Sequence, residues 1–82
     1  MIFSDLTFNT PDGIRTQAIH KFPNGWQVSI VAAPRGFGIF GILGEDTFEV
    51  AIFTSKDNML EDVIPYQTPS QISTILRVVE ML

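Results

Sequence analysis

The sequence contains no cysteine and a single histidine, His20. Without cysteine the chain can form neither disulfides nor thiolate metal sites, and this composition fits a reducing compartment such as the cytoplasm. Acid–base or nucleophilic catalysis needs a nucleophile, a base and an orienting group in a recognisable arrangement, which one histidine does not provide. We therefore predict no catalytic residues and no enzymatic activity.

Metal-binding patterns are also absent. The acidic side chains of the central region fall into two groups: Glu45, Asp46 and Glu49, and then Asp57, Glu61 and Asp62. Neither group matches the glycine-containing calcium loop that is rich in Asp and Asn. We predict that these side chains are solvated and that the protein holds no metal or other cofactor.

Positive charge and long apolar runs are scarce. Five basic residues against nine acidic ones give a net charge of −4, which argues against binding to a nucleic-acid backbone. The first residues, MIFSDLTF, have neither a basic start nor a long apolar core, so no signal peptide is expected. No apolar run approaches the ~20 residues of a membrane span, and we expect no membrane association.

Repeats, low-complexity tracts and linkers are missing as well, so residues 1–82 are predicted to form one small domain. A domain of this size buries only about 60–65% of the surface that its unfolded chain exposes. The composition is 45% hydrophobic and 17% charged, which is apolar for so small a domain. Some apolar surface is therefore predicted to meet another molecule, and a homodimer is expected.

Two turn motifs divide the first part of the chain. Thr10-Pro11-Asp12-Gly13 combines a Pro with a preset backbone angle, an Asp that bonds to the main chain and a Gly that accepts positive φ. It predicts a reversal between a first strand near residues 2–9 and a second near residues 14–22. Pro23-Asn24-Gly25 predicts another hairpin turn.

Two later segments alternate with the period of a strand. Their apolar faces are Trp26, Val28, Ile30 and Ala32 in one, and Phe48, Val50 and Ile52 in the other, which spans 47–53. Because a single connection joins them, they are predicted to pair antiparallel. The opposite face, with Val31, Ala51 and Phe53, is predicted to stay open.

The last segment changes to helical spacing. Its apolar residues are Ile72, Ile75, Leu76, Val79 and Leu82, and Thr68-Pro69-Ser70-Gln71 in front of them supplies an N-cap, a Pro at the first helical position and a capping-box Gln. This helix should cover one face of the sheet. The predicted fold class is α+β: an antiparallel sheet of three to four strands, in two hairpins, packed by one C-terminal helix.

The connection between the two alternating strands spells GxGxxG, from Gly36 to Gly41. A dinucleotide site needs a helix after the glycines, and here a strand follows. Arg35, with the backbone N–H groups of Gly36, Gly38 and Gly41, could still hold an anion. A small-ligand or nucleotide binder is therefore our alternative hypothesis.

The same connection carries no polar side chain from Gly36 to Gly44. Connections normally run over the surface and are polar, so its apolar residues must be covered by something. These residues are Phe37, Ile39, Phe40, Ile42 and Leu43. They either fold over the domain's own core or bind a partner protein, where aromatic anchors are typical of hot spots.

Several segments resemble a group of small proteins encoded by tailed bacteriophages. They are FPNGWQVSIV, the glycine-rich connection, GEDTFEVAIF and EDVIPYQTPSQISTIL, which together cover about Phe22 to Leu82. The resemblance implies an accessory protein made in the cytoplasm of an infected bacterium, a class often found to bind and redirect a host protein. It carries over no functional residue. Our leading hypothesis is a small module that binds or inhibits a host protein through its apolar loop.

Overall fold

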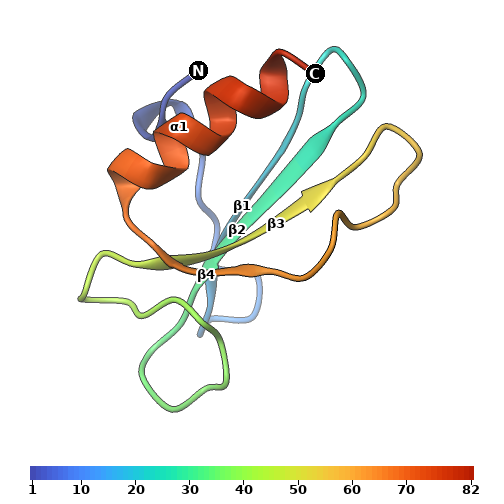
Figure 1. Ribbon diagram of the computed structural model, residues 1–82. Helices are drawn as coiled ribbons and strands as arrows, with labels where there is room; N and C mark the ends of the chain where they lie inside the picture. The colour runs from blue at the N-terminus through green and yellow to red at the C-terminus, as the bar shows by residue number, and fades with distance from the viewer.

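The computed structural model describes residues 1–82 and contains a four-stranded antiparallel sheet with one helix across one face (Figure 1). The strands are β1 (Thr16–Lys21), β2 (Gln27–Ala32), β3 (Phe48–Phe53) and β4 (Ile64–Gln67), and they lie in the order β1-β2-β3-β4. The helix α1 spans Pro69–Glu80, and a short 3-10 helix, η1, spans Phe3–Asp5. The predicted fold class is confirmed.

The hydrophobic core lies between α1 and the inner face of the central strands. Its fully buried members include Val28 and Ile30 of β2, Val50 of β3, and Ile72 and Leu76 of α1. These side chains follow a period of two in the strands and the helical period in α1, as their spacing in the sequence predicts. Fully burying a side chain of this kind stabilises the fold by about 1.5–3 kcal/mol.

The β1–β2 hairpin forms at the predicted Asn-Gly turn. The Phe22 N–H donates to the carbonyl oxygen of Trp26 at 2.7 Å, and Gly25 has a φ of 89°. Strand pairing then runs from Lys21↔Gln27 to Thr16↔Ala32. Trp26, at the end of this hairpin, is half-buried and packs against the core.

The helix begins where the capping sequence predicts. The Gln71 N–H donates to Thr68 Oγ1 at 3.3 Å, and the Thr68 N–H donates to Gln71 Oε1 at 2.8 Å. Two otherwise unpaired N–H groups of the first turn are satisfied in this way. None of the helices is long and apolar enough to cross a bilayer.

The first strand predicted near residues 2–9 is wrong. That segment contains η1, and only Asn9 pairs with the sheet, through an isolated bridge to Gln17. The Phe3 N–H donates to Ser73 Oγ at 2.9 Å, which ties the segment to α1 instead. Phe3 and Phe8 stack against Phe48 with ring centroids 5.2 and 5.5 Å away, so the segment closes one side of the core.

The fourth strand is β4, a segment for which alternation gave no signal. It pairs with β3 at only two positions, Phe48↔Gln67 and Val50↔Ile64, with a register shift between them. Pro65 lies in this strand, which is possible because β4 is at the edge of the sheet.

Candidate functional site

The glycine-rich loop, residues 34–46, leaves the end of β2 and returns to the start of β3. It is closed at its base, where the Ala33 N–H donates to the Gly41 carbonyl oxygen at 3.1 Å and the Leu43 N–H donates to the Ala33 carbonyl oxygen at 2.9 Å. The Ile42 N–H also donates to Thr47 Oγ1 at 3.1 Å. These bonds give the loop a defined conformation on the sheet.

Gly41 is the point where the loop crosses β3. It is buried, and a Cβ atom built on it would lie 2.5 Å from Phe48 Cα and from Glu49 N. No side chain fits at this distance, so glycine is required here for close contact between two backbones. The glycine at position 41 is therefore explained by this contact, without any role in binding phosphate.

The other side of the loop contacts β4. Between its two paired positions β4 has two residues, Pro65 and Tyr66, where β3 has only Glu49, and Tyr66 has a φ of 54°. A bulge of this kind re-aims the side chain and backbone of the inserted residue. The Tyr66 N–H donates to the Phe40 carbonyl oxygen at 2.8 Å, and the two rings meet edge to face with centroids 6.0 Å apart.

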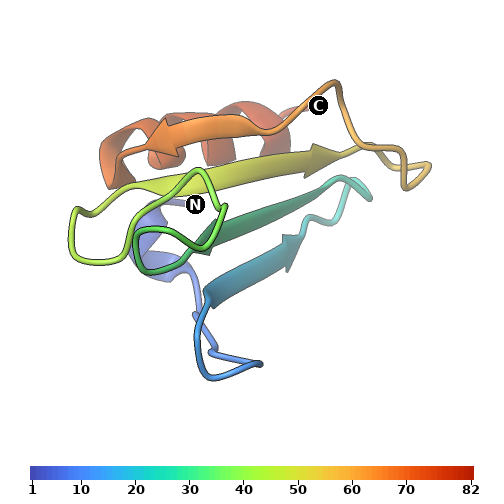
Figure 2. The same ribbon diagram turned by 90° about the horizontal axis from the view of Figure 1, so that it is seen from below.

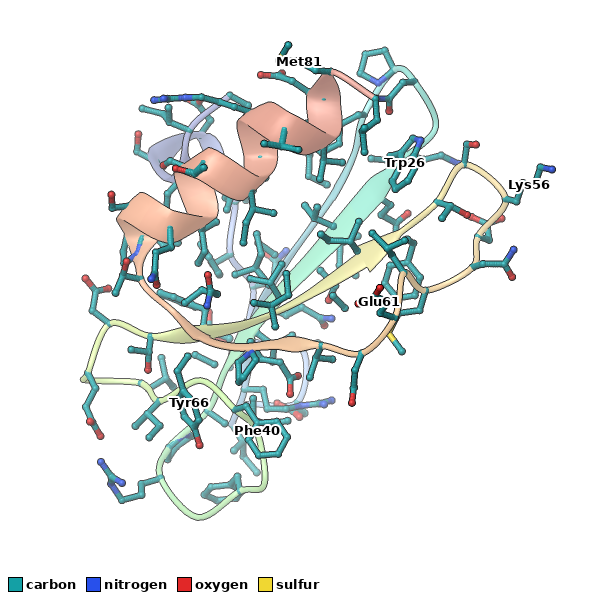
Figure 3. All side chains as sticks on the ribbon, in the orientation of Figure 1. Trp26, Phe40, Lys56, Glu61, Tyr66 and Met81 are labelled. Carbon is teal, nitrogen blue, oxygen red and sulfur yellow. The ribbon has the colours of Figure 1, made fainter.

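Several large apolar side chains of this region remain exposed. The exposed fractions are 55% for Phe37, 48% for Phe40, 41% for Leu43 and 49% for Tyr66. We call these four residues the loop patch. Figure 3 shows Phe40 and Tyr66 next to each other, on the side of the sheet away from α1. Ile39 and Ile42, the other two predicted partner-binding residues, are half-buried.

The sequence left open whether the apolar loop covers its own domain or presents its side chains to a partner, and the loop has features of both. The backbone of the loop packs on the domain's own sheet, while three of its five apolar side chains point to solvent. Figure 2 shows the loop in front of the sheet and α1 behind it. Because the loop lies outside the layer formed by helix and sheet, its side chains cannot reach the main core.

The charges around the loop patch are mostly negative. Glu49 is half-buried, and its Oε1 accepts the Phe40 N–H at 3.4 Å. Arg35 forms an ion pair with Glu45, and Asp46 is exposed beside this pair. The only basic side chain of the loop is therefore already paired with a carboxylate of the same chain.

These contacts also bear on the residues of the alternative anion site. Arg35 is paired with Glu45, and Gly41 is buried against β3. Gly36 and Gly38 have φ values of 96° and 75° and face open space. Their glycine character is explained by the backbone angle, which other residues rarely adopt.

The sheet face opposite α1 is only partly open. Val31, predicted to be open, is buried, whereas Ala51 and Phe53 are half-buried. Val31 pairs with Glu49, whose carboxylate accepts the Phe40 N–H, so the loop lies over this end of the face. At the other edge a shallow groove of about 350 Å³ is lined by Thr7, Asn9, Pro11, Gln17 and Ile19, none of which belongs to the loop.

His20 and the acidic side chains do not gather into a cluster. His20 is half-buried and packs edge to face on Phe22, with ring centroids 4.6 Å apart. No group of three or more His, Cys, Asp or Glu side chains is placed to hold a metal ion.

Tyr66 is the one member of the loop patch that the sequence analysis missed. The position of Tyr66 depends on the β4 bulge, which brings Tyr66 next to Phe40, 26 positions earlier in the chain. Pro65, which marks an edge strand or a bulge, was the available signal. Comparison with known proteins found no matching family model, and no curated protein or solved structure similar to this chain.

Proposed function

We propose that this protein is a small protein-binding module that contacts its partner through the loop patch. The observation that carries the proposal is a group of exposed aromatic and aliphatic side chains on a loop whose backbone is fixed to the sheet. Such a surface loses little conformational entropy on binding, because the main chain is already ordered. Aromatic anchors of this type are typical of interface hot spots.

The biological context of the proposal comes from the resemblance to small phage-encoded proteins. We propose that the partner is a bacterial host protein, which this chain binds or inhibits in the cytoplasm of an infected cell. A role in host takeover or in countering host defence would follow. The loop patch supports the proposal that the protein binds a partner, and the resemblance supports the proposal that this happens in an infected bacterium.

The test is capture of host proteins by the immobilised protein and by a Phe37→Asp/Phe40→Asp variant. Both rings are about half exposed, so the variant should fold, but it should lose a specifically captured partner. We expect the affinity for that partner to fall at least about 30-fold, which corresponds to loss of one hot spot of about 2 kcal/mol.

The matched control is Val78→Asp/Met81→Asp, which places the same charges at the C-terminal end of α1. Val78 and Met81 are exposed by 56% and 84%, and Figure 3 shows Met81 at the opposite end of the molecule from Phe40. This variant should retain the partner. The proposal is wrong if the loop variant still captures the same partner, or if the α1 variant loses it to the same extent.

We further propose that the protein forms a homodimer through the remainder of the sheet face. Exposed Ile19 of β1 and the half-buried Ala51 and Phe53 of β3 support this surface. Light scattering should give twice the chain mass of 9.1 kDa, and Ile19→Asp should return it to the monomer value. A monomer at all concentrations would contradict this part of the proposal.

The alternative function, an anion or nucleotide binder, is tested by a thermal-shift screen against nucleotides and cyclic dinucleotides. A ligand present at 100 times its Kd would add about 2.7 kcal/mol to the stability of the native state. The pairing of Arg35 and the burial of Gly41 favour the protein-binding proposal instead.

A further inference from the structure

The negative charge of this protein is concentrated on one part of the chain. Six of the nine acidic residues and two of the five basic residues lie in residues 34–67, from the start of the loop to the end of β4, which gives this part a net charge of −4, equal to that of the whole chain. The remaining residues are therefore close to neutral. All members of the loop patch lie within this acidic part.

Three of these acidic residues border the loop patch. Glu49 lies under Phe40 and accepts its N–H, Glu45 pairs with Arg35 at the base of the loop, and Asp46 is the next residue. The other three, Asp57, Glu61 and Asp62, lie in the β3–β4 connection. Figure 3 shows Lys56 of this connection at the edge of the molecule away from Phe40 and Tyr66, and Glu61 between Lys56 and Phe40.

The sign of this charge selects the occupant of the loop patch. A second copy would bring an equally negative loop patch against the first, and like charges facing each other oppose association. Nucleic acids and anionic lipid surfaces carry the same sign and are disfavoured for the same reason. A protein surface with basic residues around an apolar pocket has the complementary charge.

We infer that the loop patch binds a cationic protein surface, in which Lys or Arg side chains surround a pocket for the Phe40 and Tyr66 rings. This inference rests on the proposed function and adds the chemistry of the partner. Glu45, Asp46 and Glu49 attract the basic residues and speed the encounter, while the apolar side chains supply the buried contact. Binding of this kind weakens as salt screens the charges.

The test is a nuclear magnetic resonance titration of the protein with three synthetic peptides. Each has a Leu-Trp-Leu core, flanked on both sides by two lysines, two glutamines or two glutamates. The lysine peptide should shift the amide signals of residues 37–43 and of Tyr66, and the glutamate peptide should leave them unchanged. The affinity of the lysine peptide for the protein should fall at least about fivefold when salt is raised from 0.01 to 0.15 M, because the Debye length shortens from about 30 to about 8 Å.

Two triple variants separate local charge from net charge, since both remove three negative charges. Glu45→Gln/Asp46→Asn/Glu49→Gln should weaken the lysine peptide at least about fivefold and abolish the salt dependence. Asp57→Asn/Glu61→Gln/Asp62→Asn, in the β3–β4 connection, should change the affinity less than about twofold. Equal effects of the two variants would overturn the inference.

The failure of this inference is distinguishable from failure of the proposed function. If the glutamine peptide binds the loop patch as tightly as the lysine peptide, the cationic partner is wrong and apolar docking stands. Phe37→Ser/Phe40→Ser, which adds no charge, should lose the lysine peptide. If it keeps the peptide, or if the shifts map elsewhere, both the inference and the binding role of the loop patch are wrong.

Discussion

Gly41 lies where the loop and β3 are in backbone contact, and its φ is not in the left-handed region. Gly41→Ala therefore tests one effect alone, the space for a methyl group. The added Cβ would lie 2.5 Å from backbone atoms of Phe48 and Glu49, which cannot move aside as a side chain could. We expect a loss of about 3 kcal/mol in the free energy of unfolding, measured by urea denaturation.

Gly38→Ala is the matched control for this substitution. Gly38 has a φ of 75° and open space around it, so only the backbone angle opposes the methyl group. Its expected cost is about 1 kcal/mol. If Gly41→Ala proves no more destabilising than Gly38→Ala, the loop is not seated on β3 as described.

Asp12 is a carboxyl group whose pKa is lowered by the turn that contains it. The main-chain N–H of Arg15 is the largest cause, followed by the main-chain N–H of Ile14 and the Arg15 side chain, and together they lower the pKa of Asp12 from 3.8 to about 2. A carboxylate whose pKa is lower in the folded state stabilises the fold above its unfolded pKa. This contribution is lost as the pH falls from about 4 to about 2.

Asp12→Asn should therefore flatten the pH dependence of stability between pH 4 and 2 and leave the rest of the curve in place. Carboxyl carbon shifts, followed by nuclear magnetic resonance, should give an Asp12 midpoint near 2. An ordinary midpoint near 3.8 would show that the turn bonds do not persist in solution.

Among the elements, the β1–β2 turn and the end of α1 are joined by Asn24. Its Nδ2 donates to the main-chain oxygens of Val79 at 2.9 Å and Leu82 at 3.1 Å, and its Oδ1 accepts the Trp26 N–H at 3.0 Å. The same residue thus shapes the hairpin turn and satisfies oxygens at the end of the helix. The bonds link two elements 55 residues apart in the chain.

Asn24→Asp keeps the acceptor for Trp26 and removes the donor to α1. It also places a negative charge at the negative end of the helix dipole. We expect a loss of about 2 kcal/mol in the free energy of unfolding. Thermal and urea unfolding at neutral pH measure it.

Asn58→Asp is the control, because it makes the same chemical change at an exposed residue whose side chain forms no hydrogen bond. Its effect should stay within about 0.5 kcal/mol. Similar losses in the two variants would mean that added charge, and not the lost helix contact, determines the result.

At the scale of the whole molecule, the aromatic residues divide between a core group and an outer group. Phe48 is 8% exposed and is covered by Phe3 and Phe8, which the N-terminal segment brings onto the helix side of the sheet. Phe37 and Phe40 belong to the loop, which Figure 2 shows on the other side of the sheet. The small core is completed by this N-terminal segment, which adds a cover that one helix of 12 residues does not provide.

This division predicts opposite effects of the same substitution. Phe37→Asp/Phe40→Asp should keep the circular dichroism spectrum and lower the stability by less than about 1 kcal/mol. Phe48→Asp buries a charge without a partner and should unfold the domain, because a loss of about 4 kcal/mol is a large share of the stability of so small a protein. Unfolding of the Phe37/Phe40 variant would place these rings in the core and remove the support for the loop patch.

The local elements of this protein could be predicted from short stretches of its amino-acid sequence. The Thr68 capping box, the Asn-Gly turn and the alternation in residues 26–32 and 47–53 depend on neighbours only a few positions away, so their signals are complete within short windows. The apolar loop was also visible in this way, since Phe37 to Leu43 lack any polar side chain. The capping box, the turn and the two alternating strands formed as predicted, and they fix the fold class.

Which of these segments cover one another could not be predicted in this way, because it depends on long-range contacts. The N-terminal residues do not form a strand, because Phe3 and Phe8 pack on Phe48 and the Phe3 N–H bonds to α1. The strand β4 can contain Pro65 because it lies at the edge of the sheet. Tyr66 joined Phe40 through a bulge, and Gly41 met β3 backbone to backbone. Such contacts join residues distant in the chain, and their energies depend on shape and burial that no local pattern contains.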